Sequence, residues 1–121
     1  MEKPIRVLVA NHPRLMRELI LTTFEDQPDL EVVGEVADQA DIAEIVRKTA
    51  PDVLVITQDD SGKRPALCDE MLRQNPGLRI VAVAPDKNYT VHYWVSLDIR
   101  SRDVEASEEG LLAALRGRKA D

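Results

Sequence analysis

Two polar residues, Asn11 and His12, directly follow a short apolar run at residues 5–10, and Thr57 ends a second apolar run at residues 52–57. Short runs rich in valine and isoleucine are typical of parallel strands buried on both faces. In an open α/β sheet, ligands bind in the crevice at the carboxyl ends of such strands. These three side chains are therefore the first candidates for ligand binding or phosphoryl chemistry.

Each candidate has a chemical and a structural interpretation. His12 could act as a metal ligand or general base, but the chain has only one other histidine, His92, far away in the sequence. Asn11 and His12 also suit the cap of a helix that Pro13 would begin, and we expect this capping role. Thr57 offers a hydroxyl that could be phosphorylated, but we expect it to form local hydrogen bonds at the strand end.

Asp59 and Asp60 follow Thr57 on a predicted loop. Either carboxylate could accept a phosphoryl group or bind a cation if the loop folded over the crevice, although a solvated acidic turn is the simpler interpretation. Cys68 lies on the apolar face of a predicted helix, so we expect a core thiol rather than a nucleophile. Because no nucleophile–base pair or metal cluster is visible, we expect neither an enzyme nor a bound metal or cofactor.

The elements that must position these residues follow from the hydrophobic pattern. Apolar runs predict strands, and apolar residues at helical spacing predict helices between them. Strands are predicted at residues 5–10, 30–36, 52–57 and 78–84, with helices that begin near Pro13, at Asp38 or Asp41, and at Pro65. This alternating order predicts a doubly wound parallel sheet with right-handed crossovers. A last helix is predicted from Ser107 to Gly117.

Residues 88–105 should hold a fourth helix and a fifth strand, yet their composition favours a strand. Three of the four aromatic residues of the chain lie here: Tyr89, Tyr93 and Trp94. Apolar and polar residues then alternate over residues 95–100, which is typical of a half-exposed strand. We therefore expect the fourth helix to be shortened or irregular. The aromatic residues either pack on the sheet edge or form an interface, where tyrosine and tryptophan are enriched.

The composition narrows the class of protein. The 121 residues predict a single domain, and the net charge of −6 makes direct nucleic-acid binding by this domain unexpected. A single cysteine allows no internal disulfide, and no apolar run is long enough to cross a membrane. The N-terminus lacks the apolar core of a signal peptide. We expect a cytoplasmic protein.

The sequence resembles the receiver domain of bacterial response regulators, most closely the subclass usually followed by a helix-turn-helix output domain. The resemblance rests on the phrases IRVLVANHPRLMREL, PDLEVVGEVADQADIAEIVRKTAPDVLVI, NPGLRIVAVA and SEEGLLAALRG. It implies one receiver-like domain over residues 1–121, with a flavodoxin-like α/β fold: a five-stranded parallel sheet with helices on both faces. It also implies a role in two-component signal transduction or a phosphorelay, in which a partner kinase phosphorylates an aspartate.

The positions that carry this chemistry in the family are altered in this sequence. The carboxylate pair that helps to hold Mg²⁺ corresponds to Ala10 and Asn11, the acceptor aspartate to Thr57, the hydroxyl residue to Ala84 and the lysine to Val104. Ala10 and Asn11 carry no negative charge for a hard cation, and Thr57 cannot form an acyl phosphate. We therefore expect neither Mg²⁺ binding nor phosphorylation at these degenerate positions.

These observations predict an atypical receiver-like domain that acts as a phosphorylation-independent interaction or dimerisation module in signalling or transcription regulation. Its expected interface includes Tyr89, Tyr93 and Trp94, and its expected partner is another protein or a second copy, not a nucleic acid or a membrane. Two alternatives stay open. One is a small-ligand sensor at the sheet crevice, and the other is a phosphoreceiver that uses Asp59 or Asp60.

Overall fold

The computed structural model describes residues 3–59, 63–84, 89–96, 99–101, 103 and 106–117. The elements, in chain order, are β1 (Ile5–Val9), α1 (Arg14–Glu25), β2 (Leu30–Glu35), the one-turn 3₁₀ helix η1 (Gln39–Asp41), α2 (Ile42–Thr49), β3 (Val53–Thr57), α3 (Ala66–Gln74), β4 (Arg79–Ala84), β5 (Tyr89–Tyr93) and α4 (Glu108–Leu115). No helix in this described part of the chain is both long and apolar enough to cross a membrane. The first four strands and the helices between them are confirmed.

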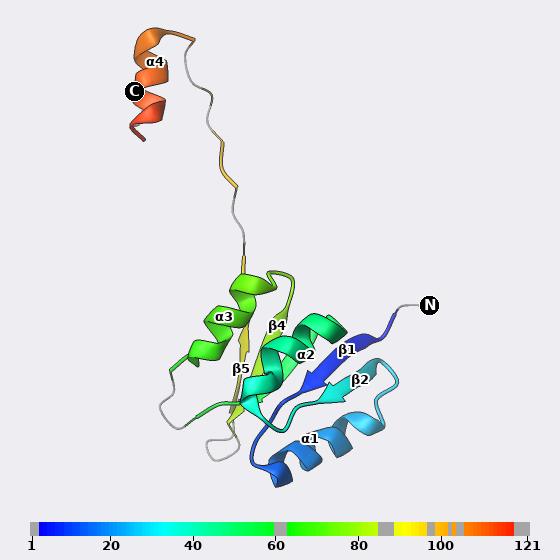
Figure 1. The fold of residues 1–121 in the computed structure, drawn as a ribbon. Helices are drawn as coiled ribbons and strands as arrows, with labels where there is room; N and C mark the ends of the chain where they lie inside the picture. The colour runs from blue at the N-terminus through cyan, green and yellow to red at the C-terminus, as the bar shows by residue number, and fades with distance from the viewer. Residues whose placement is uncertain are drawn as a thin grey trace.

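The five strands form one sheet in the order β2-β1-β3-β4-β5. β1 pairs in parallel with both β2 and β3, and β3 pairs in parallel with β4. In Figure 1, α1 lies on one face of this sheet, and α2 and α3 lie on the other. The chain therefore has the predicted doubly wound α/β arrangement, which brings the carboxyl ends of β1 and β3 together.

The prediction of a wholly parallel sheet is wrong for the last strand. β5 runs antiparallel to β4, with Ala84 opposite Tyr89 and Ile80 opposite Tyr93. Only the four residues 85–88 separate the two strands, whereas a parallel crossover needs a dozen or more residues. Among the described residues no helix lies between β4 and β5, and Tyr89–Tyr93 form a strand, as the composition of residues 88–105 indicated. The alternating pattern beyond residue 94 forms no strand among the described residues.

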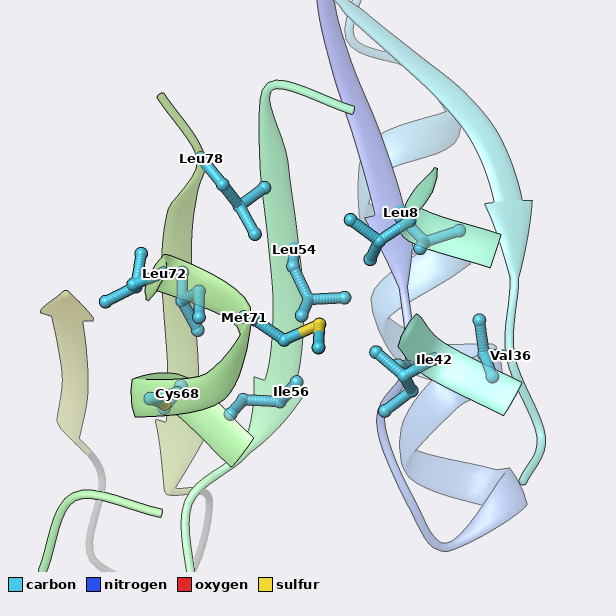
Figure 2. Packing of buried hydrophobic residues seen from close by; sticks show 13 residues of the cluster. Leu8, Val36, Ile42, Leu54, Ile56, Cys68, Met71, Leu72 and Leu78 are labelled. Carbon is cyan, nitrogen blue, oxygen red and sulfur yellow. The ribbon is translucent and has the colours of Figure 1, made fainter. Parts of the chain in front are cut away.

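The main core lies between the sheet and the pair α2 and α3 (Figure 2). Leu8, Leu54 and Ile80 point from the strands into this layer and are fully buried. Met71 and Cys68 meet them from α3. Full burial of one such aliphatic side chain contributes about 1.5–3 kcal/mol to stability. Cys68 is thus the core thiol that the sequence predicted, and desolvation raises its pKa from 9.0 to about 11.

A smaller core lies under α1 on the opposite face of the sheet. Leu15 and Leu19 recur at helical spacing but face solvent, with exposed fractions of 77% and 62%. Ile20, Leu21 and Phe24 pack on the valines of the sheet instead. Met16, Ile20 and Phe24 therefore face the core as their helical spacing indicates, whereas Leu15 and Leu19 do not.

Two predicted helix caps are confirmed. The side chain of Asp38 accepts a hydrogen bond from the backbone N–H of Ala40 and caps η1, which leads directly into α2. Ser107 caps α4 by accepting a 3.0 Å hydrogen bond from the N–H of Gly110. Gly117 follows that helix with a φ of +70°, a conformation that glycine adopts without strain. In Figure 1, α4 stands apart from the sheet.

Candidate functional site

Thr57 and His12 meet where the adjacent strands β3 and β1 end. The Oγ1 atom of Thr57 accepts a hydrogen bond from the backbone N–H of His12 at 3.1 Å and donates one to the His12 carbonyl at 2.9 Å. The side-chain Nδ2 of Asn11 donates a third hydrogen bond to the same Oγ1 at 3.3 Å. A hydroxyl has one proton to donate and two lone pairs. The hydrogen-bonding capacity of Thr57 is therefore fully used within the protein.

Asn11 and His12 do not cap α1, so this prediction is wrong. Pro13 is the residue that precedes the helix, and no side chain caps its first turn. Asn11 is fully buried, and its amide turns toward Thr57 instead. The His12 ring contacts the side chain of Gln39, with 3.2 Å between the Nε2 atoms. The predicted role fails because a partner 46 residues away outcompetes the local helix end.

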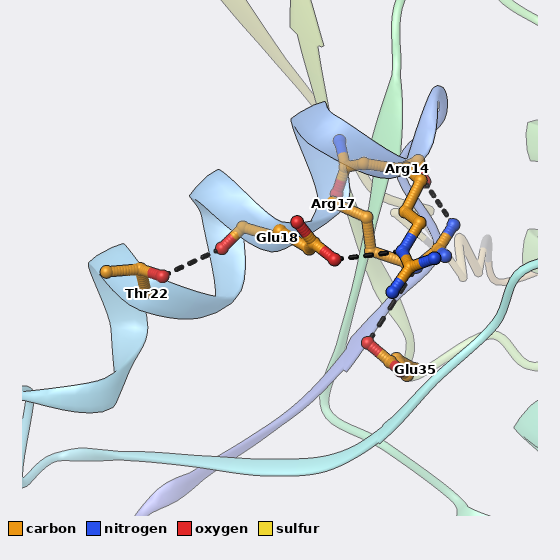
Figure 3. A network of polar contacts seen from close by, with 6 residues as sticks. Arg14, Arg17, Glu18, Thr22 and Glu35 are labelled. Atoms are coloured by element: carbon orange, nitrogen blue, oxygen red, sulfur yellow. Dashed lines mark hydrogen bonds and ion pairs between the residues drawn. The ribbon is translucent and has the colours of Figure 1, made fainter.

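Arg17 is a buried cation beside this crevice that sequence reasoning missed. Its side chain is only 11% exposed, and Nη1 donates a 3.3 Å hydrogen bond to the carbonyl of Asn11. Its Nε lies 3.7 Å from a carboxylate oxygen of Glu35 on β2 (Figure 3). The helical spacing could have indicated this burial. Arg17 lies three, four and seven residues before Ile20, Leu21 and Phe24, which pack on the sheet from the same helix face.

The remaining predicted positions differ in how they lie. Ala10 and Ala84 are buried at the ends of their strands, where each contributes only a methyl group. Asp59 is exposed on the segment after β3. Asp60 and Val104 lie outside the described residues. Ala10 and Ala84 therefore supply no polar or charged group at the ends of their strands.

Side chains that could bind a metal ion do not gather in the described part of the crevice. Among the described residues, no group of three or more His, Cys, Asp or Glu side chains could hold a metal ion. A shallow hollow of about 580 Å³ lies beside His12, lined by His12, Ala37, Asp38 and Gln39 but not by Thr57. Through Thr57 and His12, the arrangement holds the backbone of two strand ends together.

The three aromatic residues predicted as an interface are only partly exposed. Tyr89 and Tyr93 are half-buried, whereas Trp94 is 61% exposed and its ring lies 5.1 Å from that of His92. The Tyr93 hydroxyl donates a 3.2 Å hydrogen bond to Oε1 of the buried Gln58. Desolvation is the main cause that raises the pKa of Tyr93. Tyr93 is therefore part of the fold, and Trp94 is the aromatic residue that faces solvent.

The fold of the chain is similar to that of a solved receiver domain. The isolated REC domain of RcsB from Salmonella enterica serovar Typhimurium, solved in the presence of the phosphomimetic BeF3−, superposes with a TM-score of 0.59 at 19% identity. The match covers 94% of this chain and 72% of that chain. The fold is that of a receiver domain. No protein-family model matches the sequence.

Curated relatives match a part of this receiver-like chain. A protein-glutamate methylesterase/protein-glutamine glutaminase of Anaeromyxobacter dehalogenans is 35% identical over 54 residues, and that of Pyrococcus abyssi is 37% identical over 54 residues. Each match covers 45% of this chain and 15% of the relative. Because the chain spans so small a part of these proteins, their activity is not transferred to it.

Proposed function

We propose that this chain is an atypical receiver-like domain that acts in cytoplasmic signalling or gene regulation as a protein-interaction module without phosphorylation. The observation that carries the proposal is the saturated hydroxyl of Thr57, which His12 and Asn11 occupy completely. Thr57 stands where the resembled family has its acceptor aspartate. A side chain that joins two strand ends in this way serves structure and is not available as a phosphoryl acceptor.

The electrostatics of the crevice support the same conclusion. Mg²⁺ binds oxygen ligands and usually needs at least one carboxylate. Ala10 and Asn11 supply no charge, and the carbonyl of Asn11 already accepts a hydrogen bond from Arg17. The guanidinium of Arg17 places a positive charge beside that backbone carbonyl, and the carboxylate of Glu35 at 3.7 Å offsets part of it. Without the metal, the charge that develops on a transferring phosphoryl group has no offset.

A role in interaction fits what the chain leaves exposed. Trp94 stands out from the end of β5, and the leucines of α4 face solvent. Large apolar side chains that gather on a surface indicate a site of association. The proposed partner is a second copy or another protein. We propose no catalytic activity and no direct nucleic-acid contact, in keeping with the net charge of −6.

The test is intact-mass spectrometry after incubation with Mg²⁺ and acetyl phosphate. We expect the wild-type chain to stay unmodified. We also expect Thr57→Asp to stay unmodified, because the new carboxylate still lacks a metal beside it. A stoichiometric phosphoryl adduct that disappears in Asp59→Ala or Asp60→Ala would contradict the proposal and support the phosphoreceiver alternative. A thermal-shift experiment with Mg²⁺ and BeF3− gives an independent readout, in which we expect no rise in melting temperature.

A further inference from the structure

A groove lies at the end of β5, between that strand and the end of α3. Two adjoining hollows of about 690 Å³ and 430 Å³ form it, and both are lined by Pro76, His92, Trp94 and Val95. We call this surface the β5 groove. Its first hollow also includes Leu72 of α3. An apolar floor with an exposed indole is the kind of surface that binds an apolar side chain of a partner.

The rim of the β5 groove is basic. Arg64 lines it but forms an ion pair with Asp69 at 2.6 Å. Arg73 and Arg79 also line the groove, and neither forms an ion pair with any residue that the structure describes. The chain as a whole has a net charge of −6, so these two arginines make the rim of the groove locally positive on an otherwise acidic protein. They favour an occupant that combines apolar and acidic side chains.

Helix α4 has this combination. Leu111, Leu112 and Leu115 have exposed fractions of 59%, 37% and 74%. Together with Glu108 they follow the spacing i, i+3, i+4 and i+7, which places one acidic and three apolar residues on a single helix face. Glu109 adds a second negative charge to the first turn. This face has no partner on its own sheet, from which α4 stands apart in Figure 1.

We propose that α4 docks in the β5 groove of a second copy of this chain and that the exchange is reciprocal. The inference rests on the proposed function, since it names the partner of that interaction surface. The three leucines would cover Trp94 and Val95, and Glu108 would approach Arg73 and Arg79. Because each chain carries one helix and one groove, the exchange makes two identical contacts and closes as a two-fold dimer.

The connection between the two surfaces is long enough for this exchange. Trp94 and Val95 line the groove, and residues 96–107 lead from there to the first residue of α4. Twelve residues can span at most about 40 Å. The segment therefore leaves one domain at its own groove and has the reach to place the helix on a neighbouring domain.

The first test is light scattering with size-exclusion chromatography on the full chain. We expect wild type at twice the mass of one chain, and Leu111→Asp with Leu115→Asp at the mass of one chain, with dimer affinity at least about a hundredfold weaker. Leu15→Asp with Leu19→Asp is the matched control. It has the same spacing and similar exposure on α1, and it should leave the dimer intact.

The second test reverses the charges on each surface separately. The variant Arg73→Glu with Arg79→Glu makes the groove acidic, so that it repels the acidic first turn of α4. The variant Glu108→Lys with Glu109→Lys makes that turn basic, so that it is repelled by the basic groove. Each variant alone should therefore be monomeric. Mixing the two variants should restore a dimer, since each groove then meets a helix of opposite charge on the other chain. Only docking between copies produces this rescue.

Trp94, the only tryptophan, reports on the groove directly. Its fluorescence should shift to longer wavelength on dilution of the wild type, and the Leu111→Asp with Leu115→Asp variant should show the shifted spectrum at every concentration. The inference would be overturned if the wild-type chain is monomeric at high micromolar concentration. It would also be overturned if the α4 and charge variants dimerise with the same affinity as wild type. Neither result would affect the proposed function, which the phosphodonor experiment decides.

Discussion

The hydroxyl of Thr57 and the backbone of His12 are joined by two hydrogen bonds, of 3.1 and 2.9 Å, across 45 residues of sequence. They tie the end of β3 to the start of the segment that enters α1. A side chain that both accepts from and donates to one residue fixes the separation of two strand ends. These two bonds hold the ends of the adjacent strands β1 and β3 together at the crevice.

Thr57→Val removes this junction while it keeps the shape of the side chain. We expect a loss of about 1–2 kcal/mol in the free energy of unfolding, because the N–H and carbonyl of His12 lose their partner. Urea denaturation measures it. Thr22→Val is the matched control, since that hydroxyl bonds only to the carbonyl of Glu18 on exposed α1, and it should change stability by less than about 0.5 kcal/mol. Equal losses in both variants would contradict the role of Thr57.

Arg17 and Arg14 allow a comparison of a buried and an exposed cation on one helix (Figure 3). Arg14 pairs with Glu18 at 2.9 Å, but its side chain is 80% exposed, so Arg14→Met should cost at most about 0.5 kcal/mol. Arg17→Met leaves the carbonyl of Asn11 without its donor and should cost about 1–2 kcal/mol. Urea unfolding at low and high salt measures both effects. The cost of Arg17→Met should persist in high salt, and a cost that salt abolishes would mean that the cation is not effectively buried.

Cys68 provides a pH test. Its pKa is raised by burial from 9.0 to about 11, so the folded chain holds the thiol neutral. A raised pKa contributes stability that is complete below about pH 9 and is lost as the pH rises through about 11. We therefore expect the difference in free energy of unfolding between wild type and Cys68→Ala to shrink as the pH rises from about 9 to about 11, as measured by parallel urea titrations. A difference between the two proteins that stays constant with pH would show that the thiol is not shielded.

The phenol of Tyr93 is predicted to support the segment after β3. It donates a hydrogen bond to Oε1 of Gln58, whose Nε2 donates to the carbonyl of Lys63 at 2.8 Å. Tyr93→Phe should lower the free energy of unfolding by about 1 kcal/mol and increase proteolytic cleavage near residue 63. Tyr89→Phe, on the same strand, is the control and should leave the cleavage rate unchanged. Faster cleavage in both variants would point to a general effect on β5.

The sequence alone predicted the elements whose signals are local. The valine-rich runs that end at Ala10 and Thr57 indicated buried parallel strands, and Ser107 indicated the start of the last helix. Strand burial and helix capping depend on residues within one or two turns of each other, so a pattern in the sequence can report them. Cys68 was placed in the core for the same reason.

Only the tertiary structure decided which groups meet across the fold. The sequence indicated that Asn11 caps a helix, but in the fold its side-chain amide bonds to Thr57. Arg17, which the sequence interpretation did not single out, donates a hydrogen bond to the backbone carbonyl of Asn11. The direction of β5 depended on a connection too short for a crossover. The position of the Asn11 side chain results from competition between the local helix end and a partner 46 residues away, and packing rather than neighbouring residues in the chain decides such a balance.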